Sequence, residues 1–334
     1  MTLYGVMDLG LQSNKATIGT ATYKQTAMSN GVQSGSRIGF KGTEDLGGGL
    51  KANFTYEAGT DPDIASTVMT SNRQSFVGVD GGFGSVALGR QYTLHHSNQG
   101  AGDMVGNLTL AGYLGGMDSL VRQSNAVTYT SPSFSGFTVA AQMGFGETVT
   151  NAAAATGANS ATLSNEKKNE QTGLRVAYAA GPLAAGLAYE TVKNGTFAAV
   201  TYAGQATALT AADYDKRTAM NIEASYDFGV AKVGFVNNNT KFDNLGGAAG
   251  TTKWAANTLS VAAPFGAVTA FGSVGAGKLK DTDGSTITKA SAYQLGASYA
   301  LSKRTNVYAF TGQTKLKDLE AKLNQTVVGI RHQF

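Results

Sequence analysis

Hydrophobic and polar residues alternate along much of the chain, and the alternation has a period of two. It is clearest in residues 50–57, 173–178, 220–228 and 293–301. In the third of these segments, for example, the apolar residues Met220 and Ile222 flank the polar Asn221. A period of two is typical of strands, in which successive side chains point to opposite faces of a sheet. We therefore predict an all-β protein whose strands each have one apolar face.

Two kinds of connection take turns between the predicted strands. Seven short turns are predicted at residues 45–49, 81–84, 133–136, 180–183, 228–230, 264–267 and 302–304. Eight longer polar loops are predicted at residues 14–33, 61–70, 93–121, 149–168, 194–215, 243–252, 278–286 and 315–324. This alternation is typical of an outer-membrane barrel, which has short periplasmic turns, long extracellular loops and strands of about ten residues. Fifteen connections predict about sixteen strands in an antiparallel up-and-down β-barrel.

The composition fits a sheet that faces lipid. Charged residues make up only 14% of the 334 residues, against about 25% in an average soluble protein. A charge on the lipid face near the bilayer midplane costs about 2–4 kcal/mol, so few are expected there. The uncharged stretch at 254–277 contains a proline and several glycines and polar residues, and it is not a transmembrane helix. No segment has the composition of a linker, so we predict one domain over residues 1–334.

A soluble all-β binding or adhesive protein without channel activity is the alternative, because a soluble sandwich has the same period of two. The alternation of turns and loops favours the membrane barrel. So do aromatic residues near the predicted strand ends, which we expect to form girdles at the lipid interfaces. They are Tyr4, Tyr56, Tyr92, Tyr129, Tyr178, Tyr226 and Phe334.

Several kinds of chemistry are excluded. The chain has no cysteine, hence no disulfide, thiolate nucleophile or Cys-based metal site. Its three histidines, His95, His96 and His332, have no spacing that suggests a catalytic triad. We therefore expect no enzymatic activity, no cofactor and no metal. The net charge of +4 is scattered over the chain, whereas nucleic-acid binding needs a clustered basic face.

Several segments, in order along the whole chain, resemble the Gram-negative trimeric porins of β-proteobacteria. They are SRIGFKGTEDLGGGLKANFTYE from Ser36, FGSVALGRQ from Phe83, YDFGVAKVGF from Tyr226, YALSKRTNVYAF from Tyr299 and VGIRHQF from Val328. The resemblance implies a homotrimer in the bacterial outer membrane, in contact with lipid and lipopolysaccharide. It also implies passive diffusion of small hydrophilic solutes, with a preference for anions. The last residue, Phe334, resembles the assembly signal of such proteins, and we expect a mature chain whose signal peptide has been removed.

The same resemblance implies a basic filter where the third long loop, residues 93–121, folds inward and narrows the pore. Arg37, Arg73 and Arg122 match the basic cluster of the family. Arg37 and Arg122 lie on the polar side of the alternation, so we expect both to point into the lumen. Arg73 shares the side of Val77, so an inward Arg73 needs a bulge or a rim position. Guanidinium groups can replace the hydration of carboxylate, phosphate or sulfate.

Other charges could extend or oppose this filter. On the polar side of the alternation lie Lys41, Lys51, Arg175 and Lys232. They either extend the basic track or are solvated lumen charges, offset by the acids Glu57, Glu190, Glu223 and Asp227, which are also expected to face inward. The third loop carries two acids, Asp103 and Asp118. Either aspartate could define the side of the constriction that faces the arginines, and so small an acidic set favours anions over cations.

Overall fold

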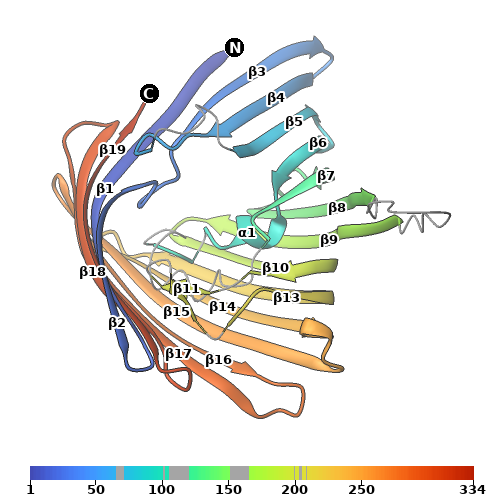
Figure 1. Cartoon of the computed structure of the whole chain (residues 1–334). Coiled ribbons are helices and arrows are strands. Elements are labelled where there is room, and N and C mark those ends of the chain that lie inside the picture. The colour runs from blue at the N-terminus through green and yellow to red at the C-terminus, as the bar shows by residue number, and fades with distance from the viewer. Residues whose placement is uncertain are drawn as a thin grey trace.

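Most of the chain forms a large antiparallel sheet that closes on itself (Figure 1), and β11 and β12 form a separate two-stranded sheet. The computed structural model describes residues 1–64, 71–100, 102–104, 120–150, 165–198, 200–202, 205–207 and 209–334. Closure joins the two ends of the chain, because β1 pairs with β19 from Val6 opposite Gln333 to Ile18 opposite Ala321. Within the described ranges, no helix is long and apolar enough to cross a membrane.

The strands of the sheet follow the chain. They are β1 (Thr2–Ile18), β2 (Ala21–Asn30), β3 (Arg37–Gly47), β4 (Leu50–Gly59), β5 (Ser71–Gly81), β6 (Gly84–Tyr92), β7 (Arg122–Thr130), β8 (Phe137–Thr150), β9 (Asn165–Ala180), β10 (Leu183–Phe197), β13 (Ala212–Asp227), β14 (Lys232–Asp243), β15 (Thr251–Phe265), β16 (Val268–Lys280), β17 (Thr286–Ala300), β18 (Thr305–Leu316) and β19 (Ala321–Gln333). Shorter elements are the helix α1 (Leu94–Asn98), the 3-10 turn η1 (Leu245–Gly247), β11 (Thr201–Tyr202) and β12 (Gln205–Ala206).

The barrel has sixteen strand positions, as predicted. The sheet contains 17 strands, but β2 and β3 both pair with β1, β2 along its second half and β3 along its first. These two strands therefore fill one position, interrupted at residues 31–36. The Asp8 carboxylate holds the interruption by accepting hydrogen bonds from the backbone N–H groups of Gln33 (2.7 Å) and Ser34 (2.5 Å). The seven predicted short turns each fall between consecutive strands.

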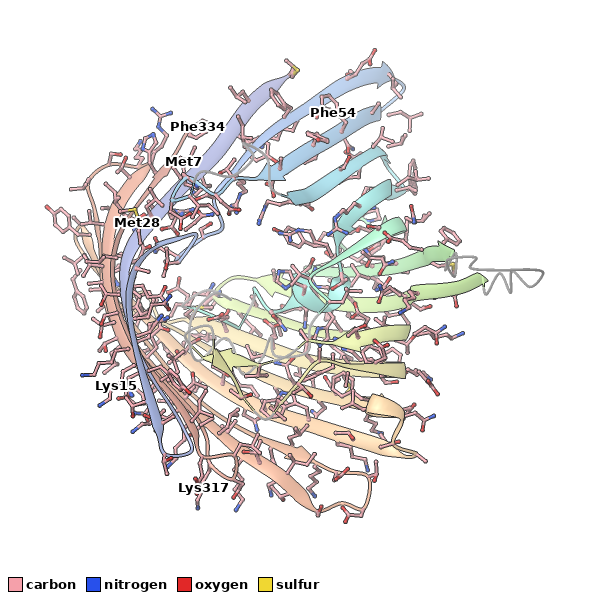
Figure 2. The ribbon with its side chains drawn as sticks, viewed as in Figure 1. Met7, Lys15, Met28, Phe54, Lys317 and Phe334 are labelled. Carbon is pink, nitrogen blue, oxygen red and sulfur yellow. The ribbon has the colours of Figure 1, made fainter. Side chains whose placement is uncertain are left out.

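Apolar side chains point away from the interior of the barrel, and many polar ones are buried inside it. Leu187 and Ile222 are exposed on the outer face, whereas their strand neighbours Glu190 and Asn221 are fully buried. Figure 2 labels further exposed apolar residues, among them Met28. A soluble sandwich buries its apolar face and exposes its polar one. The observed arrangement is the opposite, so the structure supports the barrel in lipid and not the soluble alternative.

The prediction of a loop at residues 14–33 is wrong. β1 and β2 continue as a hairpin and turn at Gly19, whose positive φ of 58° is easily adopted by glycine. β1 is 17 residues long, more than the ten expected for a strand that only crosses the bilayer. The polar outer face suggested a loop here, but pairing continues because the inner face is apolar beyond the bilayer. Its buried cluster includes Ala16, Val192 and Phe242.

Candidate functional site

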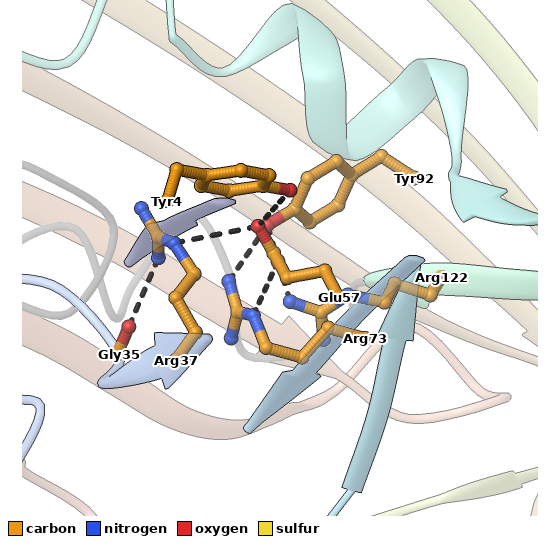
Figure 3. Close-up of polar contacts among 7 residues, drawn as sticks. All are labelled: Tyr4, Gly35, Arg37, Glu57, Arg73, Tyr92 and Arg122. Carbon is orange, nitrogen blue, oxygen red and sulfur yellow. Dashed lines mark hydrogen bonds and ion pairs between the residues drawn. The ribbon is translucent and has the colours of Figure 1, made fainter. Parts of the chain in front are cut away.

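Three arginines from separate strands converge on the inner face of the barrel (Figure 3). Arg73 of β5 donates from Nε to Glu57 Oε1 at 2.6 Å and from Nη2 to the Tyr92 hydroxyl at 2.9 Å. Arg122 at the start of β7 donates from Nη2 to the same hydroxyl at 3.1 Å. Arg37 at the start of β3 lies beside Glu57, with 3.5 Å between its Nε and Oε2. The structure therefore brings together the three arginines predicted for the filter, which we call the arginine cluster.

Glu57 of β4 lies at the centre of the arginine cluster. Its side chain is almost fully buried, and its Oε2 also accepts a hydrogen bond from the Tyr4 hydroxyl at 3.1 Å. Sequence analysis placed Glu57 in the lumen but did not assign it to the filter. The signal was present, because Glu57 shares the inward side of β4 and lies close to Arg37 in the pairing of β3 with β4. With one carboxylate against three guanidinium groups, the cluster keeps an excess of positive charge.

A bulge turns Arg73 inward, which is one of the two arrangements that an inward Arg73 was expected to need. Glu57 lies opposite Gln74 and the next residue, Ala58, lies opposite Asn72, so Arg73 has no partner residue on β4. The extra residue reverses the alternation at this point, and Arg73 leaves the side of Val77.

Arg122 reaches the arginine cluster for a different reason from the predicted one. The pairing of β6 with β7 shifts between Gly89 and Gln91, and Asn125 of β7 has a positive φ of 51°. The alternation that assigned Arg122 to the lumen is therefore interrupted between Arg122 and the regular part of β7 that follows it. Its inward position follows from the contact with Tyr92 and from a cation–π contact, with 4.7 Å from the guanidinium carbon to the centroid of that ring.

Tyr4 and Tyr92 are not lipid-interface girdle residues, contrary to the prediction. Both rings face the arginine cluster, where their hydroxyl groups meet charged partners. The Lys41 ammonium lies 5.2 Å from the centroid of the Tyr4 ring. A tyrosine near a strand end has an apolar ring and a polar hydroxyl, so its presence there does not decide which face it occupies. The other predicted girdle residues include Tyr56 and Tyr226, which are exposed on the outer face.

The start of the third loop follows the inner wall of the barrel. Thr93 caps α1, because its Oγ1 accepts a hydrogen bond from the backbone N–H of His96 at 3.1 Å. At the end of α1, Asn98 Nδ2 donates to Asn221 Oδ1 of β13 at 3.0 Å. Arg175 of β9 donates from Nε to Asn98 Oδ1 at 3.1 Å. α1 is therefore tied to two strands on the inner face.

The next residues continue along the same wall. The backbone N–H of Gly102 donates to Glu223 Oε2 of β13 at 2.7 Å, and that of Met104 donates to Ser260 Oγ of β15 at 3.0 Å. Asp103 lies between these two attachments, on the side of the barrel formed by β13–β15. The second predicted loop acid, Asp118, lies outside the described residues, as does the rest of the loop at 105–119.

Glycines in the wall leave room for this part of the loop. A Cβ atom at Gly186 would collide with Asn98 Oδ1, and one at Gly234 would collide with the carbonyl oxygen of Gly102. The inward course of the described part of the loop is thus built into β10 and β14.

The secondary lumen charges do not join the arginine cluster as a group. Arg175 binds Asn98 in the loop, and Lys41 lies beside Tyr4. Lys51 lies opposite Asp80 and Lys232 opposite Asp227, near the turn ends of their strands. Cross-strand acids therefore offset the charges of Lys51 and Lys232.

The histidines of α1 are neutral near pH 7. Burial, with Arg122 and Arg73 nearby, lowers the pKa of His96 to about 4. Burial lowers the pKa of His95 well below its ordinary value of 6.5. The positive charge at this site therefore comes from arginine. No group of three or more metal-ligating side chains occurs in the part of the chain that the structure describes.

Comparison with known proteins places this geometry in a family. A family described as Gram-negative porin matches residues 1–319. Outer membrane porin protein 32 of Delftia acidovorans is 32% identical over 100% of this chain and 94% of its own length. The anion-selective porin from Comamonas acidovorans is similar in structure, with a TM-score of 0.72, 26% identity and coverage of 100% and 99% of the two chains.

A further solved structure, the trimer form of OmpT of Vibrio cholerae, has a TM-score of 0.71 at 18% identity and coverage of 100% and 98%; it shows the shared fold. The full-length match to curated porins fixes the location as the bacterial outer membrane. The function is a transport channel and not an enzyme. Sequence, fold and inner face together show that this chain belongs to the Gram-negative porin family.

Proposed function

We propose that this outer-membrane porin conducts small anions in preference to cations, and that Arg37, Arg73 and Arg122 form its selectivity filter. The solutes would be inorganic anions and small organic acids that cross by passive diffusion. The observation that carries the proposal is the arginine cluster, in which Arg37 and Arg73 contact one carboxylate, that of Glu57, and Arg122 joins them through the Tyr92 hydroxyl.

The chemistry of the cluster supports anion preference in two ways. Arginine presents planar paired donors that match carboxylate, phosphate and sulfate oxygens, so it can replace part of the hydration shell of these ions. An excess of positive charge in a narrow aqueous passage also raises the local concentration of anions and lowers that of cations. The anion-selective porin from Comamonas acidovorans, at 26% identity, is consistent with the same behaviour here.

The third loop would supply the opposite side of the filter. Asp103 lies on the β13–β15 side of the barrel, and the arginines project from β3, β5 and β7. This arrangement would set a field across the lumen, from the basic wall to the loop. A role for Asp118 stays a prediction.

Replacement of arginines tests the filter directly. We expect R37Q together with R122Q to lower the anion-to-cation permeability ratio, measured from the zero-current potential in a planar bilayer under a salt gradient. The matched control is K303Q with R304Q, which removes two charges from the exposed turn between β17 and β18. An unchanged permeability ratio in the R37Q and R122Q variant, or an equal decrease of that ratio in the control, would show that these arginines do not form the filter.

We also propose that the chain assembles as a homotrimer. A solved relative in fold is described as a trimer form. Native mass spectrometry of the detergent-solubilised protein tests the assembly, with an expected mass of three 34.3 kDa chains. A monomeric mass under conditions that preserve the folded barrel would contradict it.

A further inference from the structure

A fourth arginine, Arg331 of β19, lies on the inner face of the barrel. Its neighbours Val328 and Ile330 are exposed on the outer face, whereas Val327 is fully buried inside. Arg331 shares the side of Val327, because successive residues of a strand point to opposite faces. It is partly exposed, so the water of the lumen reaches it. The filter proposed above does not include Arg331.

Arg331 is close to the arginine cluster along the wall. The strand β1 lies between β19 and β3 (Figure 1), with Asp8 opposite Arg331 and Val6 opposite Arg37. Neighbouring strands are about 4.8 Å apart, and two residues of a strand span about 6.8 Å. The Cα atoms of Arg331 and Arg37 are therefore about 12 Å apart. The charge of Arg37 acts on Arg331 over this distance, so an anion held at one arginine also lies in the field of the other.

The carboxylate that lies opposite Arg331 already has other partners. Asp8 Oδ2 accepts hydrogen bonds from the backbone N–H groups of Gln33 and Ser34, and its Oδ1 accepts one from the Tyr308 hydroxyl at 2.6 Å. Asp8 is also fully buried. Among the described residues, no ion pair includes Arg331. Asp8 therefore lowers the positive potential around Arg331 but leaves the guanidinium as the charge that faces the lumen.

The guanidinium of Arg331 keeps hydrogen-bonding capacity. With its amide oxygen turned toward Arg331, Gln333 accepts from Nη2 and, at 3.3 Å, from Nη1. The Nε of Arg331 has no hydrogen-bond partner in the part of the chain that the structure describes. A guanidinium group has five N–H donors in one plane, and an oxyanion can accept from two of them at once. Arg331 can therefore bind a carboxylate or a phosphate without giving up an ion pair.

Neutral amide side chains surround Arg331. Asn306 of β18 lies opposite Arg331, and its Nδ2 donates to Gln33 Oε1 at 3.0 Å. Gln33 belongs to the interruption between β2 and β3, which is thereby tied to β18. In the arginine cluster, by contrast, Arg73 is bound to the carboxylate of Glu57. An anion at Arg331 meets amide groups, which can donate hydrogen bonds and carry no negative charge.

We propose that Arg331 forms a second anion-binding position in the lumen, next to the arginine cluster, and that it takes small oxyanions such as phosphate and carboxylates. The inference rests on the proposed anion channel and adds a residue that its filter does not contain. Two neighbouring positions let an anion pass from one guanidinium to another without regaining its full hydration between them. Several weak sites favour conduction, because an ion must be able to leave as well as to enter.

The expected effect of R331Q follows from the loss of one charge. For a monovalent anion about 6 Å from the guanidinium, at an ionic strength of about 0.1 M, this loss lowers the occupancy by a factor of about two. For dianionic phosphate the factor is about four. R331Q should therefore lower the single-channel chloride conductance about twofold, and it should raise about fourfold the phosphate concentration that halves this conductance.

The test measures both quantities in planar bilayers for R331Q, R331K and K280Q, with inorganic phosphate in its dianionic form as the probe. K280Q is the matched control and should leave both values unchanged, because Lys280 is exposed and its neighbour Leu279 packs inside the barrel. R331K keeps the charge but loses the planar donors. It should therefore retain the chloride conductance and bind phosphate more weakly than the unmodified protein does. Far-UV circular dichroism confirms that each variant is folded.

The outcomes separate the second position from the filter. Equal values in R331Q and K280Q would overturn the second position, whereas the filter is tested separately by R37Q with R122Q. A conductance that falls equally in R331K and R331Q would also overturn it, because the effect would then come from structure and not from charge. A cation-selective unmodified protein would contradict the proposed function itself, and with it the inference that rests on it, whatever the response of R331Q.

Discussion

Replacing Glu57 with glutamine is expected to strengthen the anion preference of the channel. The Glu57 carboxylate contacts Arg73 at 2.6 Å and Arg37 at 3.5 Å, so it offsets part of their charge. Glutamine has nearly the same shape and can still accept hydrogen bonds through its carbonyl oxygen. The substitution therefore removes a negative charge while keeping the groups around it in place.

The size of the effect follows from Coulomb's law. For an ion that passes about 5 Å from Glu57 in a water-filled lumen, one unit of charge changes its energy by about 0.8 kcal/mol before screening. At an ionic strength of about 0.1 M, screening reduces this to about 0.5 kcal/mol. The anion gains this energy and the cation loses it. The permeability ratio should therefore rise about fivefold, because about 1.4 kcal/mol corresponds to a factor of ten.

The assay is the zero-current potential across a planar bilayer that holds the E57Q channel. The double variant E57Q with R73Q is the control, because it restores the net charge of the arginine cluster and should return the ratio close to that of the unmodified protein. A ratio that is unchanged in E57Q, or that shifts toward cations, would refute the assignment of Glu57 as a charge that limits the filter.

Three further predictions concern the loop and the buried charges. G186A should displace α1 from the wall, because the added Cβ collides with Asn98 Oδ1, and single-channel conductance should change; an unaltered conductance would contradict the tight fit. The pKa of His96 is lowered from 6.5 to about 4, so the equilibrium constant for docking of its neutral form falls about tenfold per pH unit as pH decreases through this window. The unmodified channel should therefore show conductance steps below pH 6 that are absent in H96Q; steps that persist in H96Q would exclude His96 as their cause. E190Q removes the buried carboxylate that Arg217 Nη1 contacts at 2.7 Å and should destabilise the barrel by about 3 kcal/mol in urea unfolding; unchanged unfolding would show that the pair contributes little.

Much of the fold could be predicted from the sequence because a barrel strand repeats one simple pattern. The alternation around Met220 and Ile222 identified the outer face of β13, and the turns placed the strand boundaries at one end of the barrel. The other end was harder to predict. Beyond the bilayer the outer face becomes polar, as at Lys15, while the inner face becomes apolar, as at Ala16. At the loop end of the barrel, therefore, the polar face points outward and the apolar face points inward. The paired strands at that end have the polar composition of loops, which is why residues 14–33 were predicted as a loop.

The site was predicted in part for a similar reason. Arg37 follows the regular alternation of β3, and the expected bulge at Arg73 is present. The irregularity of β7 after Arg122 and the inward ring of Tyr92 could not be read from alternation, because each depends on a partner in another strand. Tyr4, by contrast, follows the alternation of β1, in which Leu3 and Met7 are exposed and Val6 and Asp8 are buried. The central position of Glu57 likewise depends on how neighbouring strands are aligned, which composition and period do not determine.

The most direct test of the account is the zero-current potential of the unmodified protein in a planar bilayer under a salt gradient. The account predicts a stable conductance whose potential lies toward that of the anion, because the arginine cluster holds more positive than negative charge. A potential toward that of the cation would contradict the proposed filter and would assign control of the channel to the acids of the loop and lumen.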